Sequence, residues 1–512
     1  MKIRKNVFFP TAIVIIAFLV FYVVDSERFD RKLESLNTSL NAVFGEMYLV
    51  IAVFLVIVSV IVLFSKMGKV KIGGESAKPL LSTGNWFTVV LCTTIAAGLI
   101  FWGSSEPVFH LMAPPPFAGV KPETHSSAVF SMTTMFLHWT ITPYAIYGIP
   151  ALMFAIAVYN EKKPFSFSSC ISGVFPKAGS PVSASIIDSM CVFATVMGMI
   201  ASLGQGILSI AGGMTEITGH SSTKTMWALI GVTIAIVFTL SACSGVLKGI
   251  KWISNINTGF LLTLLVIVFL VGPTTYIVQL SLESFGVYID NFFTRSLMIG
   301  AGTGSDWSYF WTISTFANWM AWAPVTGMFL GKIAYGHSVR KFIGINIGAA
   351  ALCSGFWINV FGGTSIYQQL NGVKIYEKMQ TAGTESAVYE MLKALPFGKI
   401  LVPLLVFAVA LSVITAADST TNVLGDLCCT YDGTGTCIDE DKKEKSGKSL
   451  NIVKIVWGIL LGSMSVIMIC FKGIAGVKLI SVIGGLPAAI LLLLSGMGLL
   501  KVTMRYLREG TR

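Results

Sequence analysis

The chain has 512 residues, of which 54% are hydrophobic and only 12% are charged. Apolar runs of about 20 residues recur along its whole length, so a lipid bilayer is the expected medium and a soluble globular protein is excluded. The formal net charge of +11 therefore bears on membrane topology and does not indicate a nucleic-acid partner.

Taken in chain order, the apolar runs predict an all-α polytopic membrane protein with 12 transmembrane helices. A spanning segment must satisfy its own backbone polar groups, and the alternating strand pattern of a membrane barrel does not occur in the sequence. The predicted spans are Phe8–Val24, Met47–Ser65, Trp86–Val108, Ala128–Tyr159, Ser183–Ala211, Thr225–Cys243, Ile256–Thr274, Trp307–Tyr335, Phe342–Phe361, Ile400–Leu427, Ile452–Cys470 and Val477–Val502.

Basic residues are unevenly distributed between the two sides of this arrangement. A cytoplasmic N-terminus puts most of the 36 lysines and arginines on the cytoplasmic side, in agreement with the positive-inside rule. Both termini are therefore predicted to be cytoplasmic, in the cytoplasmic (inner) membrane. The first apolar run has a basic start but no small-residue cleavage site, which indicates a retained helix and not a signal peptide.

Three connecting segments have a recognisable character. Val278–Phe293 mixes apolar and polar residues and predicts an amphipathic helix at the membrane interface, with a partly ordered loop as the alternative. Ala387–Leu395 predicts a short external helix. Thr430–Lys448 has the composition of a solvated cytoplasmic linker.

Polar or helix-breaking residues interrupt three of the predicted spans. Thr93 and Thr94 lie in the third span, Pro143 lies in the fourth, and Thr415–Asn422 fills the second half of the tenth. Polar groups are costly in lipid and usually face a cavity. Spans three and eight are five spans apart, which suits a carrier built from two inverted five-helix repeats after two extra helices.

Two of the predicted helices carry aromatic residues at membrane depth. Trp319 and Trp322 are three residues apart and share one helical face, with Asn318 at its edge. Trp139, Tyr144 and Tyr147 belong to the fourth span. Aromatic faces attract a quaternary ammonium by roughly 0.5–2 kcal/mol per ring, so these residues predict a cage for a cationic or zwitterionic solute. The alternative is helix packing or an interfacial belt, and we assign Trp307 and Trp311 to such a belt.

The residues around these tryptophans resemble the betaine/carnitine/choline transporter family. The match runs from Trp319-Met320-Ala321-Trp322-Ala323-Pro324 through Gly327–Ile333 to Gly336–Phe342, and further matches are Phe101–Pro107, His138-Trp139, Leu247–Lys251 and Ala417-Asp418-Ser419. The resemblance covers essentially the whole chain.

This resemblance implies a leucine-transporter-like core in spans three to twelve and a homotrimer. It divides the chain into residues 1–85, a cytoplasmic N-terminus with two peripheral helices, and two inverted repeats at 86–274 and 307–502. An interfacial amphipathic segment, 275–306, lies between the repeats, and 503–512 form a short basic cytoplasmic tail.

The resemblance also implies an aromatic box for trimethylammonium-type solutes. Carried over position by position, the residues that match the box and its access path are Trp139, Tyr144, Tyr147, Trp319 and Trp322. Phe109 matches a tyrosine that lines the site in carnitine exchangers. Asn318 departs from the family, which usually has the first tryptophan of a pair there, so a less methylated ligand or one with a polar group for the amide becomes credible.

The coupling mode has two readings. Thr415 matches a hydroxyl position of sodium-coupled relatives, although Ala416 replaces the neighbouring serine. At a second site, beside Thr195, Met199 and Val325 replace a threonine and an aromatic residue. Thr415, Thr195 and Ile95, in the break of the third span, are the candidate Na+ ligands. The segment Thr94–Gly98 is closer to the sodium-independent exchangers, although Asn257 stands where those place an arginine. Cation-coupled uptake is favoured, and a substrate/product antiporter is the alternative.

Other classes of membrane protein fit the sequence less well. A channel would need a carbonyl filter or a charged pore ring, which nothing in the sequence resembles. An enzyme would need clustered acids, histidines or a nucleophile with its base, and these are scattered. We therefore expect a secondary transporter of a small molecule that works by alternating access, with no enzymatic activity, no resident cofactor and no bound metal, apart from Na+ as a candidate coupling ion.

Overall fold

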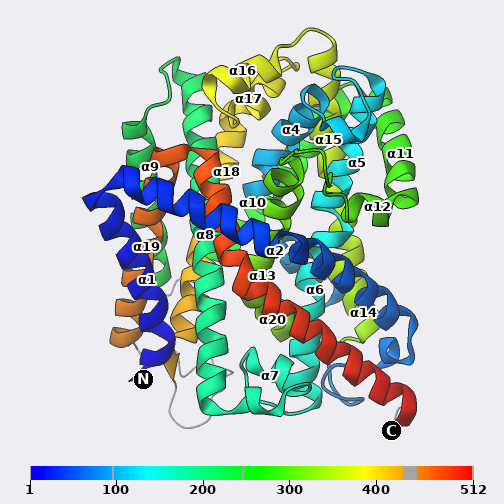
Figure 1. Cartoon of the computed structure of the whole chain (residues 1–512), viewed down its shortest axis with the longest axis vertical. Coiled ribbons are helices and arrows are strands. Elements are labelled where there is room, and N and C mark those ends of the chain that lie inside the picture. The colour runs from blue at the N-terminus through cyan, green and yellow to red at the C-terminus, as the bar shows by residue number, and fades with distance from the viewer. Residues whose placement is uncertain (1, 95–96, 245–246, 431–446, 510–512) are drawn as a thin grey trace.

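The protein is a bundle of helices that lie side by side (Figure 1). The computed structural model describes residues 2–94, 97–244, 247–430 and 447–509. Within these residues the helices are α1 (Lys5–Val24), α2 (Ser26–Phe64), η1 (Lys66–Lys69), α3 (Thr83–Thr94), α4 (Ala97–Met112), η2 (Pro116–Ala118), α5 (His125–Trp139), α6 (Ile141–Ala155), η3 (Ile156–Asn160), α7 (Ser168–Ser172), η4 (Pro176–Gly179), α8 (Pro181–Thr218), α9 (Lys224–Ser244), α10 (Leu247–Val271), α11 (Thr274–Asp290), α12 (Phe292–Ser296), η5 (Tyr309–Ile313), α13 (Ser314–Lys332), α14 (Val339–Ile343), η6 (Gly344–Ala349), α15 (Ala350–Leu370), α16 (Ile375–Ala382), α17 (Ser386–Lys393), α18 (Gly398–Leu427), α19 (Gly447–Lys472) and α20 (Ile474–Glu509).

Two short strands tie the N-terminus to the body of the protein. β1 (Lys2–Ile3) pairs antiparallel with β2 (Cys429–Thr430). The next residue, Arg4, donates hydrogen bonds to the Leu427 carbonyl and to Asp188 Oδ2, the latter at 2.7 Å. These contacts hold the start of α1 beside the end of α18 and the first turns of α8.

Nine helices among the described residues are long and apolar enough to cross a membrane, and ten if one bent pair is counted as a span. The nine coincide with nine of the twelve predicted spans. The bent pair joins the last part of α10 to α11 at 103° and contains the predicted span Ile256–Thr274. The spans predicted at Trp86–Val108 and Trp307–Tyr335 are outside this set, so the full number of twelve stays a prediction.

The predicted connecting helices have formed where the structure describes them. The amphipathic segment is α11, which buries Ile277, Leu280, Ser284 and Tyr288 against the body and leaves Leu282 and Phe285 on its exposed side. The short helix predicted at Ala387–Leu395 is α17, which packs against α8 and α18. Most of the predicted linker, residues 431–446, lies outside the described residues.

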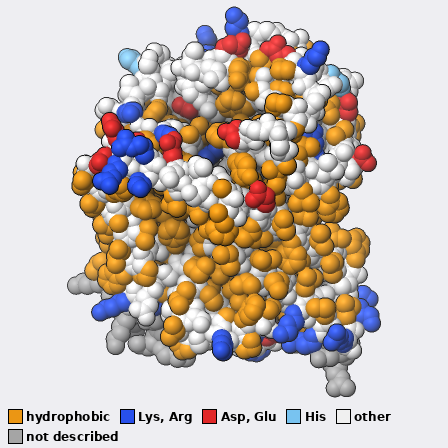
Figure 2. Space-filling model, viewed as in Figure 1, with side chains coloured by type: hydrophobic (Ala, Val, Ile, Leu, Met, Phe, Trp, Pro, Cys, Tyr) orange, Lys and Arg blue, Asp and Glu red, His pale blue; other side chains and the backbone are white. Residues whose placement is uncertain are grey.

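The surface separates into an apolar band and two polar ends. Figure 2 shows hydrophobic side chains around the middle of the molecule and lysines and arginines along the lower edge. That edge is the end at which both termini lie in Figure 1, opposite α16 and α17. This pattern is expected of a multi-pass membrane protein, because the band faces lipid and the polar ends face water.

Helix α13 lies in the centre of the bundle and packs against α6, α8 and α20. Glycines make these close approaches possible. A Cβ on Gly331 would lie 2.6 Å from the Ala151 carbonyl oxygen of α6, and one on Gly485 of α20 would lie 2.6 Å from the Ala317 carbonyl oxygen. The backbones around α13 are therefore in direct contact, and the side chains near Asn318 and Trp319 point into the interior between four helices.

Candidate functional site

A small hollow lies beside α13, next to the point where a neighbouring helix is interrupted: α5 ends at Trp139 and α6 starts at Ile141. This break was predicted from Pro143, which has no N–H to donate to the Trp139 carbonyl, and the prediction is confirmed. The hollow is lined by Trp102, Glu106, Trp139, Gln205, Trp311, Ser314, Thr315, Asn318, Trp319, Lys478 and Ser481.

The first aromatic group on this hollow is centred on Trp319, and we call it the Trp319 cluster: Trp139, Tyr144, Tyr147 and Trp319. Ring centroids of Trp139, Tyr144 and Tyr147 lie 5.6, 6.1 and 5.1 Å from that of Trp319. All four side chains are buried. Trp139 and Trp319 line the hollow, whereas Tyr144 and Tyr147 contact Trp319 without being among the lining residues.

The remaining predicted box residues lie around this cluster at different places. Asn318 lines the hollow, and its Oδ1 accepts a hydrogen bond from Ser481 at 3.0 Å. Trp322 lies one turn further along α13, where its indole packs against Gly198 of α8. Phe109 lies nearer the α16 end of the bundle, between Trp311 and Tyr376. The structure therefore brings three of the seven predicted residues to the hollow itself: Trp139, Asn318 and Trp319.

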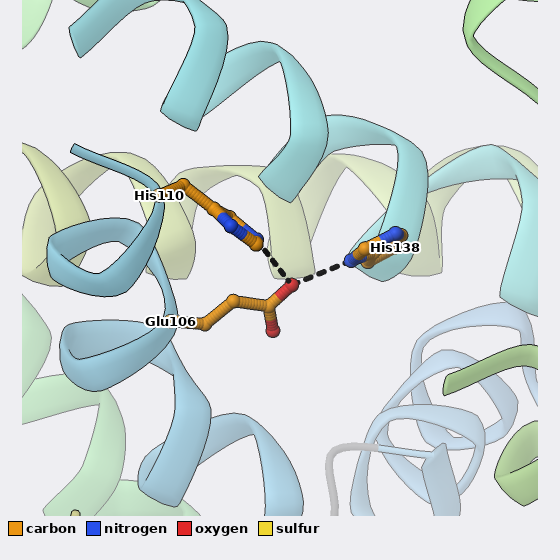
Figure 3. A group of neighbouring side chains, drawn as sticks. All are labelled: Glu106, His110 and His138. Atoms are coloured by element: carbon orange, nitrogen blue, oxygen red, sulfur yellow. Dashed lines mark hydrogen bonds and ion pairs between the residues drawn. The ribbon is translucent and has the colours of Figure 1, made fainter. Parts of the chain in front are cut away.

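A buried carboxylate lies at the same hollow and was not predicted as a site residue. Glu106 of α4 is 1% exposed, and Figure 3 shows it between His110 and His138. Its Oε1 lies 2.5 Å from His138 Nδ1 and 3.3 Å from His110 Nε2, and its Oε2 accepts a hydrogen bond from Trp139 Nε1 at 2.9 Å. His138 Nε2 in turn lies 3.0 Å from the Thr312 hydroxyl.

Glu106, His110 and His138 have the side-chain types of a metal site, and their ligand atoms lie within 4.8 Å of one another. Two ligands of a tetrahedral zinc ion stand roughly 3.3 Å apart, given metal–ligand distances near 2.0–2.1 Å. The 2.5 Å separation of Glu106 Oε1 and His138 Nδ1 is that of a hydrogen bond. The geometry therefore fits a carboxylate held by three N–H donors, in which Glu106 fixes the orientation of the Trp139 indole.

We call a second aromatic group the Trp311 cluster: Trp102, Phe310 and Trp311. Trp102 and Trp311 line the hollow, whereas Phe310 is 42% exposed. The ammonium of Lys478, from α20, lies 3.8 Å from the Trp311 ring centroid, 3.9 Å from that of Phe310 and 4.7 Å from that of Trp102. The interpretation of Trp311 as an interfacial belt residue is wrong, because its ring is 6% exposed and contacts Trp102 and His110 inside the bundle.

Two of the candidate cation ligands bond to carbonyls of their own helices. Thr195 of α8 donates to the Cys191 carbonyl at 2.8 Å, and Thr415 of α18 donates to the Leu411 carbonyl at 2.7 Å. Ile95 lies outside the described residues. Asn257 of α10 donates to the Ser412 hydroxyl at 2.6 Å, so an amide bridges α10 and α18 there.

Sequence reasoning left out Glu106, Lys478 and Trp311 as residues of the hollow. A signal for the two charged residues was present, because each lies inside a predicted span, where an ionisable side chain is costly unless it faces a cavity or a partner. Trp311 carried no such signal, since an indole near the end of a span is equally typical of an interfacial belt.

Comparison with known proteins connects these features to one group of membrane proteins. The model of the BCCT, betaine/carnitine/choline family transporter, matches residues 6–507. The chain is 32% identical to the ectoine/hydroxyectoine transporter of Virgibacillus pantothenticus over 498 residues, which are 96% of this chain and 95% of that one. It is 28% identical to the glycine betaine transporter OpuD of Bacillus subtilis, over 96% of this chain and 93% of the relative.

A third relative, the betaine/ectoine transporter LcoP of Corynebacterium glutamicum, is 26% identical over 97% of this chain and 77% of its own length. The match to the family model extends over nearly the whole chain and includes every helix that lines the hollow. On these grounds the chain belongs to the betaine/carnitine/choline transporter family.

Proposed function

We propose that this protein is a secondary transporter of compact zwitterionic solutes of the betaine and ectoine type. The observation that carries the proposal is the hollow in the middle of the bundle, which is lined by the indoles of Trp139 and Trp319 together with the amide of Asn318. Ring faces attract an organic cation without a buried anion. The amide offers hydrogen bonds to a solute whose cation still carries N–H groups, as the amidinium of ectoine does.

Transport would follow alternating access between two inverted repeats, residues 86–274 and 307–502. Support comes from the place of the hollow, between α4, α5 and α8 of the first repeat and α13 and α20 of the second. Carriers of this kind bind solute near the bilayer midplane at interrupted helices, and the two halves then rock around it. A homotrimer in the cytoplasmic membrane, with both termini cytoplasmic, completes the proposal.

The favoured coupling is symport with a cation, and Na+ is the first candidate. Thr195 and Thr415 would supply hydroxyl oxygens and the backbone around Ile95 would supply carbonyls, which are the hard ligands that a small cation prefers. Sodium-independent exchange is the second candidate. The hydrogen bond between Asn257 and Ser412 favours exchange, because this neutral contact joins α10 and α18 without an ion.

Transport assays with the purified protein in liposomes test both the proposed solutes and the proposed coupling. Labelled glycine betaine and labelled ectoine are offered with an inward Na+ gradient, with K+ in its place, and to liposomes preloaded with unlabelled solute. Symport predicts accumulation above equilibrium only with the Na+ gradient. Exchange predicts uptake only into preloaded liposomes, whatever the gradient. Absence of saturable uptake of either solute in every condition would reject the proposed function.

A further inference from the structure

Lys478 supplies the protein's own cation to one side of the hollow. It is the fifth residue of α20, and its ammonium lies against the rings of Trp311, Phe310 and Trp102. The ammonium also donates a hydrogen bond to the Phe310 carbonyl oxygen at 2.9 Å. Ring faces and a carbonyl dipole both stabilise positive charge, so the ammonium is fixed in position at the wall of the hollow.

The ammonium has bonding capacity that the protein leaves unused. A lysine ammonium has three N–H donors, and the Phe310 carbonyl is the one hydrogen-bond acceptor for Lys478 in the part of the chain that the structure describes. Ser481, three residues later on the same face of α20, also lines the hollow, and its hydroxyl lies 3.0 Å from Asn318 Oδ1. Because that contact uses the amide oxygen, the Asn318 NH2 group is left to face the hollow.

The carboxylate at the hollow is already engaged by other donors. Both oxygens of Glu106 already accept hydrogen bonds, from His110 and His138 on Oε1 and from Trp139 on Oε2. Glu106 therefore offsets the charge of Lys478 across the hollow while its own acceptor positions are largely occupied. Donor positions of the ammonium therefore remain for an anionic group.

We propose that Lys478 binds the carboxylate of the transported solute and so selects carboxylate-bearing zwitterions over organic cations that have no carboxylate. The inference rests on the proposed function and adds its selectivity. A zwitterion would place its cationic end at the Trp319 cluster and its carboxylate between the Lys478 ammonium and the Asn318 amide. A cation alone would meet the like charge of Lys478 in a medium of low dielectric constant, which disfavours binding.

Glycine betaine and choline form a matched pair of ligands for the test. Both carry a trimethylammonium group, and they differ in that choline has a hydroxymethyl group where glycine betaine has the carboxylate. Dissociation constants for both, and for ectoine, are measured by titration calorimetry on the full-length protein in detergent. The variants are Lys478→Met, which keeps the length of the side chain, and Lys478→Arg, which keeps the charge.

Lys501→Met is the control variant. Lys501 lies on the same helix and also donates from Nζ to a backbone carbonyl, that of Gly173 at 2.8 Å, but it is remote from the hollow. We expect Lys478→Met to weaken glycine betaine and ectoine binding at least tenfold and to leave choline binding unchanged or tighter. Lys478→Arg is expected to keep most of the preference for glycine betaine, and Lys501→Met to change neither ligand.

The outcomes separate the inference from the proposed function. Equal weakening of glycine betaine and choline by Lys478→Met would show a general structural role and overturn the inference, as would no change in either. If Lys478→Met does not purify as folded protein, Lys478→Gln carries the same comparison. Failure of the wild-type protein to bind any of the three ligands would count against the proposed function itself.

Discussion

The two aromatic clusters at the hollow differ in what lies against their rings. In the Trp319 cluster the rings lie against one another, with centroids 5.1–6.1 Å from that of Trp319. In the Trp311 cluster the rings surround the ammonium of Lys478. Since ring faces attract any cation, the Lys478 ammonium already occupies the faces that the Trp311 cluster could offer to a solute. An aromatic-rich wall is thus open to a cationic solute only where the chain does not supply its own cation.

The largest effect is expected from Glu106→Gln, because Glu106 joins the two clusters. Its carboxylate accepts from Trp139 of the Trp319 cluster and from His110, which contacts Trp311. A neutral amide would face one of the three N–H donors with its own NH2 group, and Lys478 would lose the negative charge across the hollow. We expect a loss of about 3–4 kcal/mol in the free energy of unfolding, seen as a clearly lower melting temperature.

Glu283→Gln is the control for that substitution. Glu283 also pairs with a histidine, His125, but both side chains are about half exposed to solvent, so the pair is worth well under about 1 kcal/mol. If the two variants melt at the same temperature, Glu106 does not hold the clusters together.

Trp319→Ala tests whether the Trp319 cluster is the side that binds the cation. We expect the affinity for glycine betaine and choline to fall together, by about 30- to 100-fold, because one ring face and the support it gives to Trp139 are both lost. Trp307→Ala is the matched loss of an indole, from a residue that packs against His110 and Phe117 away from the hollow. Equal effects of the two changes on titration-calorimetry affinities would contradict the assignment.

Asn318→Trp would make the Trp319 cluster larger at the expense of the amide. The added ring favours a fully methylated nitrogen, whereas the lost NH2 group no longer supports a solute with N–H groups or a carboxylate. We expect the ratio of glycine betaine to ectoine affinity to rise by about fivefold in competition binding. An unchanged ranking would mean that the amide has no part in selectivity.

A separate effect on stability concerns the end of the bundle near α16, where Tyr376 contacts Phe109, which in turn contacts Trp311. Glu385, between α16 and α17, is buried against Gly212 of α8 and close to Tyr389, and burial raises its pKa to about 7. The folded protein therefore binds this proton more tightly than the unfolded chain, and stability falls as the pH rises from about 4.5 to about 7. The two pKa values differ by about 2.5, which corresponds to an expected loss of about 3 kcal/mol.

Thermal unfolding between pH 5 and pH 8 measures this loss, and Glu385→Gln should remove the part that Glu385 contributes. Glu377→Gln, on the neighbouring α16, serves as the control and should leave the pH dependence as it is in the wild type. A wild-type melting temperature that rises from pH 5 to pH 7 would contradict the sign of the effect.

Local sequence signals predicted the parts of this protein that depend on one helix at a time. The apolar runs located nine spans that the structure confirms, and Pro143 located the break beside Trp139. Their spacing along one helix predicted that Asn318 and Trp319 would contribute to one binding site, and both line the hollow. The division into inverted repeats, the trimer and the candidate cation ligands stay predictions.

Contacts between helices that are distant in the sequence could not be predicted from local sequence signals. Glu106 and Lys478 are the lone charged residues near their positions in predicted spans, yet nothing in the sequence says that α4 and α20 meet at one hollow. Trp311 looked like a belt residue because an indole near the end of a helix has the same local pattern whether it faces lipid or protein.

The sequence by itself determined the medium, the helices and the family, because hydrophobic length, helix-breaking residues and motifs are properties of consecutive residues. Only the tertiary structure decided that the rings of the Trp311 cluster surround a lysine and that Trp139 and Trp319 line the hollow. That arrangement depends on how α4, α13 and α20 approach one another. Gly485 of α20, for example, lies in close contact with the backbone of Ala317 of α13.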